Sequence, residues 1–332
     1  VALTPLFWFV TEQLIGLPPA VAKAMHIPFI IMIPWSAMIG WRRHLQGILI
    51  RHSATQAVGW GTTVRMITLT GVGVGTALFS GLPGIICVAL ALVTSVAAEA
   101  GFVHFASRRI LALHYDHSDS LTDLSIRALV KFHLPLALAT IVMFTSGPMV
   151  SAAIANLADP VGNLAAWQVA SSMVFMFRTI VFALPEVVIA LAHDEHSKAQ
   201  LKTFCLRVGA GTMGLLMVFA LTGLDRWVFS RLLGASPEIV KVAHIATLCS
   251  LALPGVNAAI SFVRGMMAVL RRTMARLWAV GASVGTLALA LSLGVWLKLP
   301  GVAVAGLSLI CSALAEWFVL AFALRRAPTE VR

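Results

Sequence analysis

Tyrosine and charged side chains are scarce in this chain. It has 1 tyrosine beside 17 phenylalanines and 9 tryptophans, and 11% of its residues are charged whereas 59% are hydrophobic. Its mean hydropathy is +0.93. No globular core can hide that proportion of apolar side chains, so the composition excludes a soluble domain and indicates a multi-span membrane protein. The apolar runs are about 20 residues long, which favours an all-α polytopic protein over a lipid-facing β-barrel.

Cysteine is rare as well, and no common catalytic signature stands in the structural context that its chemistry needs. HExxH does not occur, and the GxSxG match at 281–285 lies inside a long apolar segment, where its glycines are predicted to serve close helix packing, so we expect no enzymatic activity. The loops at 114–119 and 193–196 contain histidine and acidic residues, but no second half with matching spacing exists, and we expect neither a metal nor another cofactor. Four cysteines stand singly without CxxC spacing and are predicted to be small packing residues: Cys87, Cys205, Cys249 and Cys311.

Acidic residues are outnumbered by basic ones, 13 to 24, which gives a net charge of +11. Threading the apolar segments alternately through a bilayer leaves Arg178 alone within the hydrocarbon. Five basic residues fall on one face, and the rest fall on the other face, which the positive-inside rule makes cytoplasmic, together with the C-terminus. The charge therefore reflects insertion into the cell (inner) membrane, and we expect no nucleic-acid partner. The five residues on the opposite face are Lys23, Arg226, Arg231, Lys241 and Lys298.

Ten apolar segments can be counted along the chain. The first is short and is followed by two prolines, so we interpret it as the tail of a helix. No stretch between the segments is long enough for a soluble domain. The ten segments are residues 1–17, 19–41, 62–81, 82–107, 124–156, 164–193, 208–224, 240–267, 277–297 and 301–324.

Two of these segments share a plan and indicate an internal repeat. Each has a proline within the span, then a glycine, then a basic pair: Pro34, Gly47, Arg51 and His52 in one, and Pro254, Gly265, Arg271 and Arg272 in the other. The two copies are six segments apart, an even number, so both have the same orientation. Parallel repeats imply a pseudo-twofold axis along the membrane normal.

The repeat predicts two six-helix lobes, of which this chain holds about ten helices with the first two missing. We expect an incomplete N-terminal lobe over residues 1–107 and a polar cytoplasmic connector over residues 108–123. A six-helix C-terminal lobe would then occupy residues 124–332.

The segment at 164–193 carries Arg178 almost at its middle. An arginine at the centre of a spanning helix costs about 2.5 to 3.5 kcal/mol on insertion scales, so it normally faces a polar cavity or a partner. Pro185 cannot donate a hydrogen bond to the carbonyl of Val181, and we expect the helix to bend there, close to Glu186. Arg178 would either contact a substrate or form a structural ion pair, with Glu99 as a candidate partner.

Other polar residues in the spans are candidates for the transport path. Glu99 and Glu186 are acids whose neutral form is favoured by desolvation, so each could take up a proton or Na⁺ as the coupling ion. The alternative for an acid is a pair with a cytoplasmic arginine, and for a hydroxyl or amide it is a bond between helices. The remaining candidates are Thr145, Ser146, Asn156, Gln168 and Ser172.

Twelve helices arranged as six plus six resemble the multidrug, oligosaccharidyl-lipid and polysaccharide exporter superfamily, whose fold is called MATE-like or the MOP fold. Three stretches are similar, more narrowly, to the progressive ankylosis protein family. They are GWRRHLQGILIRHSATQAVGWGTTVRM at 40–66, KFHLPLALATIVMFTSGPMVSAAIAN at 131–156, and FALPEVVIAL around Glu186.

This resemblance implies export of small polyvalent anions, namely pyrophosphate, nucleotide or citrate, by alternating access through a cavity between two lobes. Glu186 stands where the family keeps a glutamate, and Pro148 matches a proline on the preceding helix, so we expect Pro148 and Pro185 to act as hinges. Animal members have basic residues just before that proline, whereas residues 144–147 are Phe-Thr-Ser-Gly. An anion site would therefore depend on Arg178.

Two other activities fit the same fold. One is a flippase for a lipid-linked sugar or another amphipath, which needs a cavity open sideways to lipid. The other is a cation-coupled multidrug antiporter, whose cationic substrate Arg178 would repel. We expect the protein to act as a monomer in the bilayer.

Overall fold

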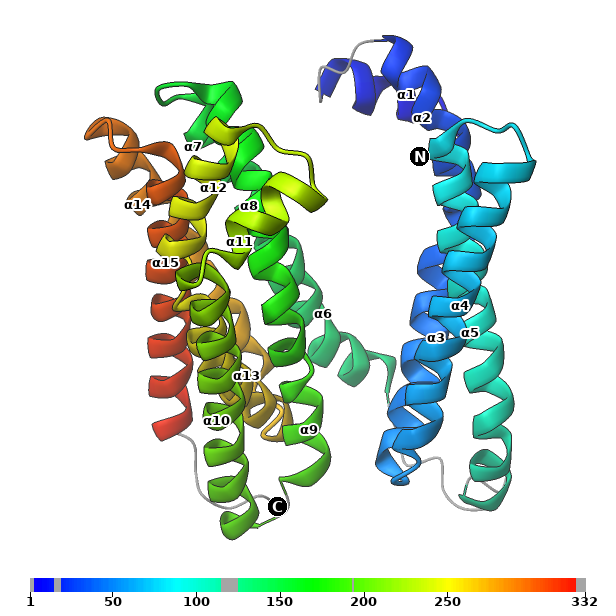
Figure 1. Cartoon of the computed structure of the whole chain (residues 1–332). Coiled ribbons are helices and arrows are strands. Elements are labelled where there is room, and N and C mark those ends of the chain that lie inside the picture. Colours follow the sequence, from blue (N-terminus) through cyan, green and yellow to red (C-terminus); the bar gives the residue numbers. More distant parts are fainter. Residues whose placement is uncertain (1–2, 15–18, 115–124, 193, 327–332) are drawn as a thin grey trace. The chain divides into compact units, whose positions relative to one another are not determined.

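The computed structural model describes residues 3–14, 19–114, 125–192 and 194–326 (Figure 1). Every regular element within these ranges is a helix. The chain divides into two compact units, which we name the N-terminal unit, Val1–Leu121, and the C-terminal unit, Thr122–Arg332.

Eight helices in the described residues are long and apolar enough to cross a bilayer, or nine if one bent pair counts as a single span. These nine correspond to nine of the ten predicted segments, so the all-α polytopic class is confirmed. The first predicted segment holds only α1 (Leu6–Trp8) and a π-helical turn, η1 (Phe9–Leu14), in its described part. Neither is long enough to span.

The N-terminal unit is built on three long helices that pack side by side (Figure 1). A short helix, α2, leads into α3, and Pro34 occupies the second position of α3, where the first turn needs no hydrogen bond from its nitrogen. Leu45, Leu49 and Val103 form the buried core between α3 and α5. The elements are α2 (Pro19–Ile31), α3 (Ile33–Arg51), α4 (Thr55–Phe79) and α5 (Gly84–His114).

The C-terminal unit has six spans, three of which are interrupted. The breaks lie at Thr145, at Ala183 and at residues 250–252, and the last one bends its span by 41°. The interruption expected at Pro185 is thus present two residues earlier. The elements are α6 (Ile126–Phe144), α7 (Ser146–Ala155), α8 (Pro160–Phe182), α9 (Leu184–Leu191), α10 (Glu195–Leu221), α11 (Leu224–Trp227), η2 (Val228–Leu232), α12 (Pro237–Cys249), α13 (Leu253–Val269), α14 (Thr273–Trp296) and α15 (Gly301–Arg325).

Two apolar clusters hold opposite ends of the interrupted helices. Ala166 and Ala170 of α8 pack with Ala243 of α12. Beyond the breaks, Val188 of α9 packs with Ala258 of α13, in a cluster that also contains the buried Cys205. Each cluster therefore joins one half of the α8–α9 span to the corresponding half of the α12–α13 span.

Gly265 allows α9 and α13 to approach closely. A Cβ atom at this position would lie 2.6 Å from the Cβ of Val188 and 3.1 Å from the carbonyl oxygen of Pro185. The first distance is shorter than real Cβ contacts, and the second is tight against a backbone atom. Gly47, which shares the place of Gly265 in the predicted repeat, has nothing within 4 Å of such an atom.

The substitution Gly265→Ala is expected to lower the free energy of unfolding by about 1 to 3 kcal/mol, the usual effect of overpacking. Gly47→Ala is the matched control and should be neutral or stabilising by up to about 1 kcal/mol, because alanine has the higher helix propensity. Thermal unfolding in detergent measures both. Equal melting temperatures for the two variants would contradict the close approach.

The turns after α3 and α13 repeat each other in detail. Ser53 and Arg271 both adopt positive φ, at 59° and 54°. The next amide closes an equivalent hydrogen bond in each turn, from Ala54 to the carbonyl of Leu49 at 2.8 Å and from Arg272 to the carbonyl of Met267 at 2.9 Å. A helix starts directly afterwards in both units, so the predicted repeat has a structural counterpart.

Candidate functional site

Glu99 lies at the centre of a buried polar group in the N-terminal unit. Its side chain has no exposed surface, and its Oε2 atom accepts a hydrogen bond from Nη1 of Arg42 at 2.7 Å. Gln46 donates to the other carboxylate oxygen, Oε1, at 3.0 Å. The Nε atom of Arg65 lies 3.9 Å from Oε2. The structure thus shows Glu99 paired with an arginine, the alternative to a transport role, and its coupling role stays a prediction.

Glu316 forms the matching group in the C-terminal unit. Its Oε1 atom accepts hydrogen bonds from Arg264, at 2.7 Å from Nε and 2.5 Å from Nη2. The side chain of Glu316 is 7% exposed, and that of Arg264 is 16% exposed. Both nitrogens contact the same carboxylate oxygen, so this is a charge-assisted contact and not a fork in which each nitrogen meets its own oxygen.

The two glutamates occupy equivalent places. Each lies fifteen residues after the glycine that begins its helix, Gly84 or Gly301, and a Leu-Pro dipeptide precedes both glycines. The two Leu-Pro-Gly sequences at 82–84 and 299–301 are the signal that could have revealed this equivalence, and the proline and glycine pattern noted above does not include them.

Arginine burial is broader than the charge pattern implied. Arg178 was expected to be alone within the spans, but Arg42 and Arg264 are also largely buried on span helices, since each is neutralised by a carboxylate. The predicted segment at 19–41 ended before Arg42 and so placed it in a loop, whereas α3 continues to Arg51.

Removing one partner of such a pair leaves the other as an unpaired buried charge. Glu99→Gln is therefore expected to destabilise the protein by about 3 to 5 kcal/mol. Glu195→Gln is the control, because Glu195 is 78% exposed and its bond to Lys198 is a surface pair. A surface pair contributes about 0 to 1 kcal/mol. Urea or thermal unfolding in detergent compares the two, and similar losses would refute a structural role for the Glu99 group.

Arg178 projects from α8 toward α13. Its Nη2 atom donates to Oδ1 of Asn257 at 3.3 Å, and its Cζ atom lies 5.2 Å from the ring centre of Phe182. The Asn257 amide is held in place because its Nδ2 donates to the carbonyl of Leu253 at 2.6 Å. Among the described residues, nothing accepts a hydrogen bond from the buried Nε of Arg178. No carboxylate in the same range forms an ion pair with it.

Positive charge accumulates around this position. Arg264 is close enough to repel both Arg178 and Arg276, and Glu316 is the carboxylate that acts on Arg276. The Nε atom of Arg276 is also buried without a hydrogen-bond partner among the described residues. Arg264 and Arg276 thus share one carboxylate, and Arg178 lies near Arg264 without a carboxylate partner among the described residues, a balance that favours an anion.

Four polar residues follow one face of the α8–α9 span. Gln168, Ser172, Thr179 and Glu186 are exposed in the C-terminal unit and recur at intervals of four or seven residues, which helical geometry places in one line. Ser172 and Thr179 satisfy their hydroxyls on carbonyls of α8, at 2.7 and 2.6 Å. Arg178 borders this line, which we name the polar stripe. Glu186 is the ionisable member of this stripe, and its charge favours water or protein beside it over lipid.

The other sequence candidates sit near helix ends. Thr145 caps the break between α6 and α7, where its hydroxyl donates to the carbonyl of Val142 at 2.7 Å, and Ser146 begins α7. Asn156 follows the end of α7 and donates to the carbonyl of Ala152 at 2.8 Å. Pro148 is exposed in the first turn of α7. No hydrogen bond joins these residues to Arg178 in the described part of the chain.

Comparison with known proteins identifies the architecture. A mutant of the Vibrio cholerae MATE transporter VcmN has a TM-score of 0.75 and 17% identity, over 97% of this chain and 75% of that one. VcmN in its bent form has a TM-score of 0.72 and 17% identity, over 96% and 74%. The chain has the MATE transporter fold. An inward-facing multidrug resistance MATE family transporter of the MOP superfamily is also similar, with a TM-score of 0.56 and 12% identity over 99% and 79%.

Sequence comparison adds nothing beyond this fold: no protein-family model matches the chain, and no curated protein matches it. The expectation of a MATE-like fold is confirmed by the structural likeness, which shows the fold alone at these identities.

One buried titratable group in this MATE fold has no counterpart among the sequence predictions. Asp225 is fully buried, and its Oδ2 atom lies 2.5 Å from Nδ1 of His244. The Nε2 atom of His244 is 2.9 Å from Nη2 of Arg226. An arginine can only donate, so this contact requires Nε2 to accept and places the imidazole proton on Nδ1. The aspartate and the histidine are nineteen positions apart, a spacing that matches no motif, which is why the sequence did not reveal them.

The loop at 193–196, weighed above as a metal ligand set, starts a helix instead. His193 lies outside the described residues, and Asp194 is the N-cap of α10 in a reciprocal capping box with Ser197. The backbone N–H of Ser197 donates to Oδ1 of Asp194 at 2.7 Å. Hydrogen bonds from Ser197 hold the pKa of Asp194 below the usual value. The bond from the Ser197 side chain has the largest effect, and the bond from its backbone has the next largest. The predicted loop at 114–119 lies outside the described residues apart from the backbone of His114.

Because the folded-state pKa is lowered, this cap stabilises α10 fully above the ordinary aspartate pKa of about 3.9 and loses its effect as the pH falls through the folded-state pKa. We expect the amide protection of Ser197, corrected for the intrinsic pH dependence of exchange, to drop in that acidic range. Asp194→Asn keeps the acceptor without titrating and should remove the drop. Persistence of the drop in that variant would assign it to another group.

Proposed function

We propose that this chain is part of a secondary-active membrane exporter of small organic or phosphorylated anions, such as pyrophosphate, a nucleotide or a citrate-like acid. Alternating access is the mechanism, and a proton or Na⁺ is the coupling ion. The multi-span composition and the MATE fold support a transporter, and the cationic group around Arg178 supports the anionic substrate class.

Arg178 is the observation that carries the proposal. Its guanidinium is anchored at one nitrogen by Asn257 and retains a buried Nε donor with no acceptor among the described residues. A planar fork of donors suits the paired oxygens of a carboxylate or phosphate. The neighbouring Arg264 still repels Arg178, although Glu316 pairs with Arg264 and orients it. An anion would relieve the repulsion between these arginines, whereas a cation would increase it.

The polar stripe supplies the path along which such an anion would move. Its amide and hydroxyl groups offer hydrogen bonds without fixed charge, and Glu186 at its end is the candidate for ion coupling. The similarity of residues 131–156 and of the stretch around Glu186 to the progressive ankylosis family supports the same substrate class. The membrane face rich in arginine and lysine would be cytoplasmic, as the positive-inside rule requires.

Transport by proteoliposomes tests this function. Wild-type protein is expected to move at least one of pyrophosphate, ATP and citrate. Arg178→Gln should lower kcat/KM by about tenfold to a hundredfold, since a hydrogen bond to a charged group contributes about 1.5 to 3 kcal/mol. Arg178→Lys should recover only part of the loss, because lysine keeps the positive charge but lacks the planar set of guanidinium donors. Arg207→Gln, at an exposed site on α10, is the control and should leave the rate unchanged.

The second candidate is a cation-coupled multidrug antiporter, which the likeness to a multidrug resistance MATE family transporter favours. The same variants separate the two. A lipophilic cation such as tetraphenylphosphonium would be exported by the antiporter, and Arg178→Gln would raise its flux by removing a repulsive charge. Absence of anion flux together with this increase would replace the anion proposal.

A further inference from the structure

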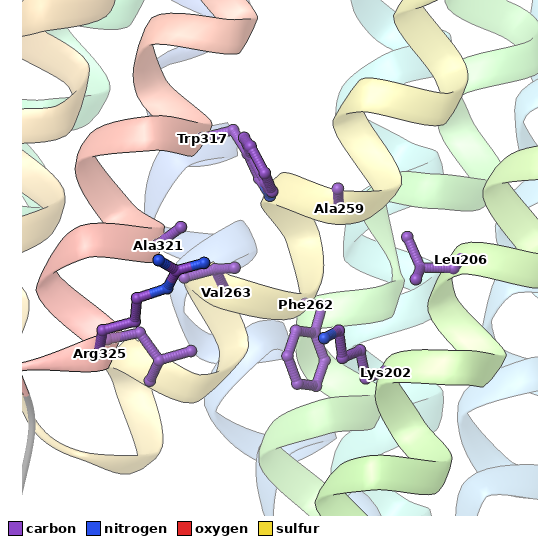
Figure 2. Close-up of a pocket in the computed structure, with 9 residues that line it drawn as sticks. Lys202, Leu206, Ala259, Phe262, Val263, Trp317, Ala321 and Arg325 are labelled. Atoms are coloured by element: carbon purple, nitrogen blue, oxygen red, sulfur yellow. The ribbon is translucent and has the colours of Figure 1, made fainter.

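The outer surface of the C-terminal unit carries a groove that the transport path does not use. Helices α10, α13 and α15 enclose it, and its volume is about 330 Å³ (Figure 2). Apolar side chains make up its walls, and two basic side chains are the charged members of its lining. The nine lining residues are Lys202, Leu206, Ala259, Phe262, Val263, Trp317, Ala321, Leu324 and Arg325.

The two basic residues belong to one end of this groove. Lys202 lies in the first third of α10, and Arg325 is the last residue of α15, so both stand near the end of a span. Figure 2 shows the Lys202 ammonium beside the Phe262 ring and the Arg325 guanidinium beside Ala321 and Val263. The methylene groups of both side chains lie along apolar surface and their charged ends are exposed, as is usual for basic side chains at a membrane boundary.

Trp317 marks the opposite end. It stands eight residues before Arg325, which is about 12 Å along a helix. Between them the groove is lined by Ala321 on α15 and by Ala259 on α13, and these small side chains leave room for a chain of methylene groups. None of the nine lining residues is acidic. The groove thus has a cationic end, formed by Lys202 and Arg325, which we name its mouth. The rest, its apolar body, is long enough for part of an acyl chain.

We propose that this groove binds an anionic phospholipid of the membrane leaflet on the arginine-rich side. The lipid phosphate lies between Lys202 and Arg325, and one acyl chain runs past Phe262 toward Trp317. Basic pockets between spanning helices hold acidic lipid headgroups in this way, and each basic residue near the surface contributes about 1 kcal/mol, which is roughly a fivefold gain in binding. A free phosphate would leave the apolar body unused. The site is independent of the exported substrate.

Quenching of Trp317 fluorescence by lipids with brominated acyl chains tests the site. The protein is placed in vesicles that contain brominated phosphatidylglycerol among plain phosphatidylcholine, or brominated phosphatidylcholine among plain phosphatidylglycerol. The difference between wild type and Trp317→Phe isolates the signal of this tryptophan from that of the others. We expect Trp317 to prefer phosphatidylglycerol by roughly 25-fold, from two basic residues at about fivefold each.

Charge variants assign the preference to the mouth of the groove. Lys202→Gln combined with Arg325→Gln should abolish the preference for phosphatidylglycerol while leaving both lipids able to quench. Arg326→Gln is the matched control, because Arg326 stacks at 4.2 Å on the ring of Phe322 and is not part of the lining. It should leave the preference unchanged.

Three results would overturn the proposal. Equal quenching by the two brominated lipids in the wild type would mean that the groove meets only the general lipid surroundings. Quenching by neither would mean that protein covers the groove, from elsewhere in the chain or from a second copy. Displacement of the bound lipid by millimolar glycerol phosphate would identify a site for free phosphate instead.

Discussion

Pairing of buried arginine with buried glutamate is the constraint on which both units depend. A membrane interior tolerates neither charge alone, so the Arg42–Glu99 and Arg264–Glu316 contacts fix which faces of their helices must meet. In each unit the arginine belongs to the first helix of a three-helix set and the glutamate to the third. The middle helix, α4 or α14, then packs along the third. The pair thus specifies a register that apolar packing by itself leaves open.

The same requirement explains why Arg178 stands apart. Its partner is the neutral amide of Asn257, which orients the guanidinium but does not balance its charge. Structural arginines in this protein have acquired carboxylates at equivalent places in two units, whereas Arg178 has no equivalent partner among the described residues. The difference separates the charges that hold the fold from the charge of Arg178, which we propose binds the anion.

Hydropathy was sufficient to predict nine spans, because each is an apolar run bounded by polar or turn residues. It failed where a helix carries polar residues for packing: the sequence Trp-Arg-Arg-His at 41–44 lowered the local hydropathy, yet α3 continues through it to Arg51. The break near Pro185 was predictable because proline lacks a donor. The contact of Arg178 with Asn257, and that of Asp225 with His244, join residues far apart along the chain without motif spacing, so only the three-dimensional arrangement reveals them.

The breaks in the α8–α9 and α12–α13 spans have a mechanical consequence when taken together. The backbone hydrogen-bond ladder is already interrupted at Ala183 and at residues 250–252, where Pro185 and Pro254 lack donors. Separate apolar clusters tie α8 to α12 and α9 to α13. A change of angle at both joints would break no further backbone hydrogen bond, and the close contact at Gly265 would make α9 follow α13. The hydrogen bond from Arg178 to Asn257 joins α8 to α13 across these joints, so any such change of angle would be felt at Arg178.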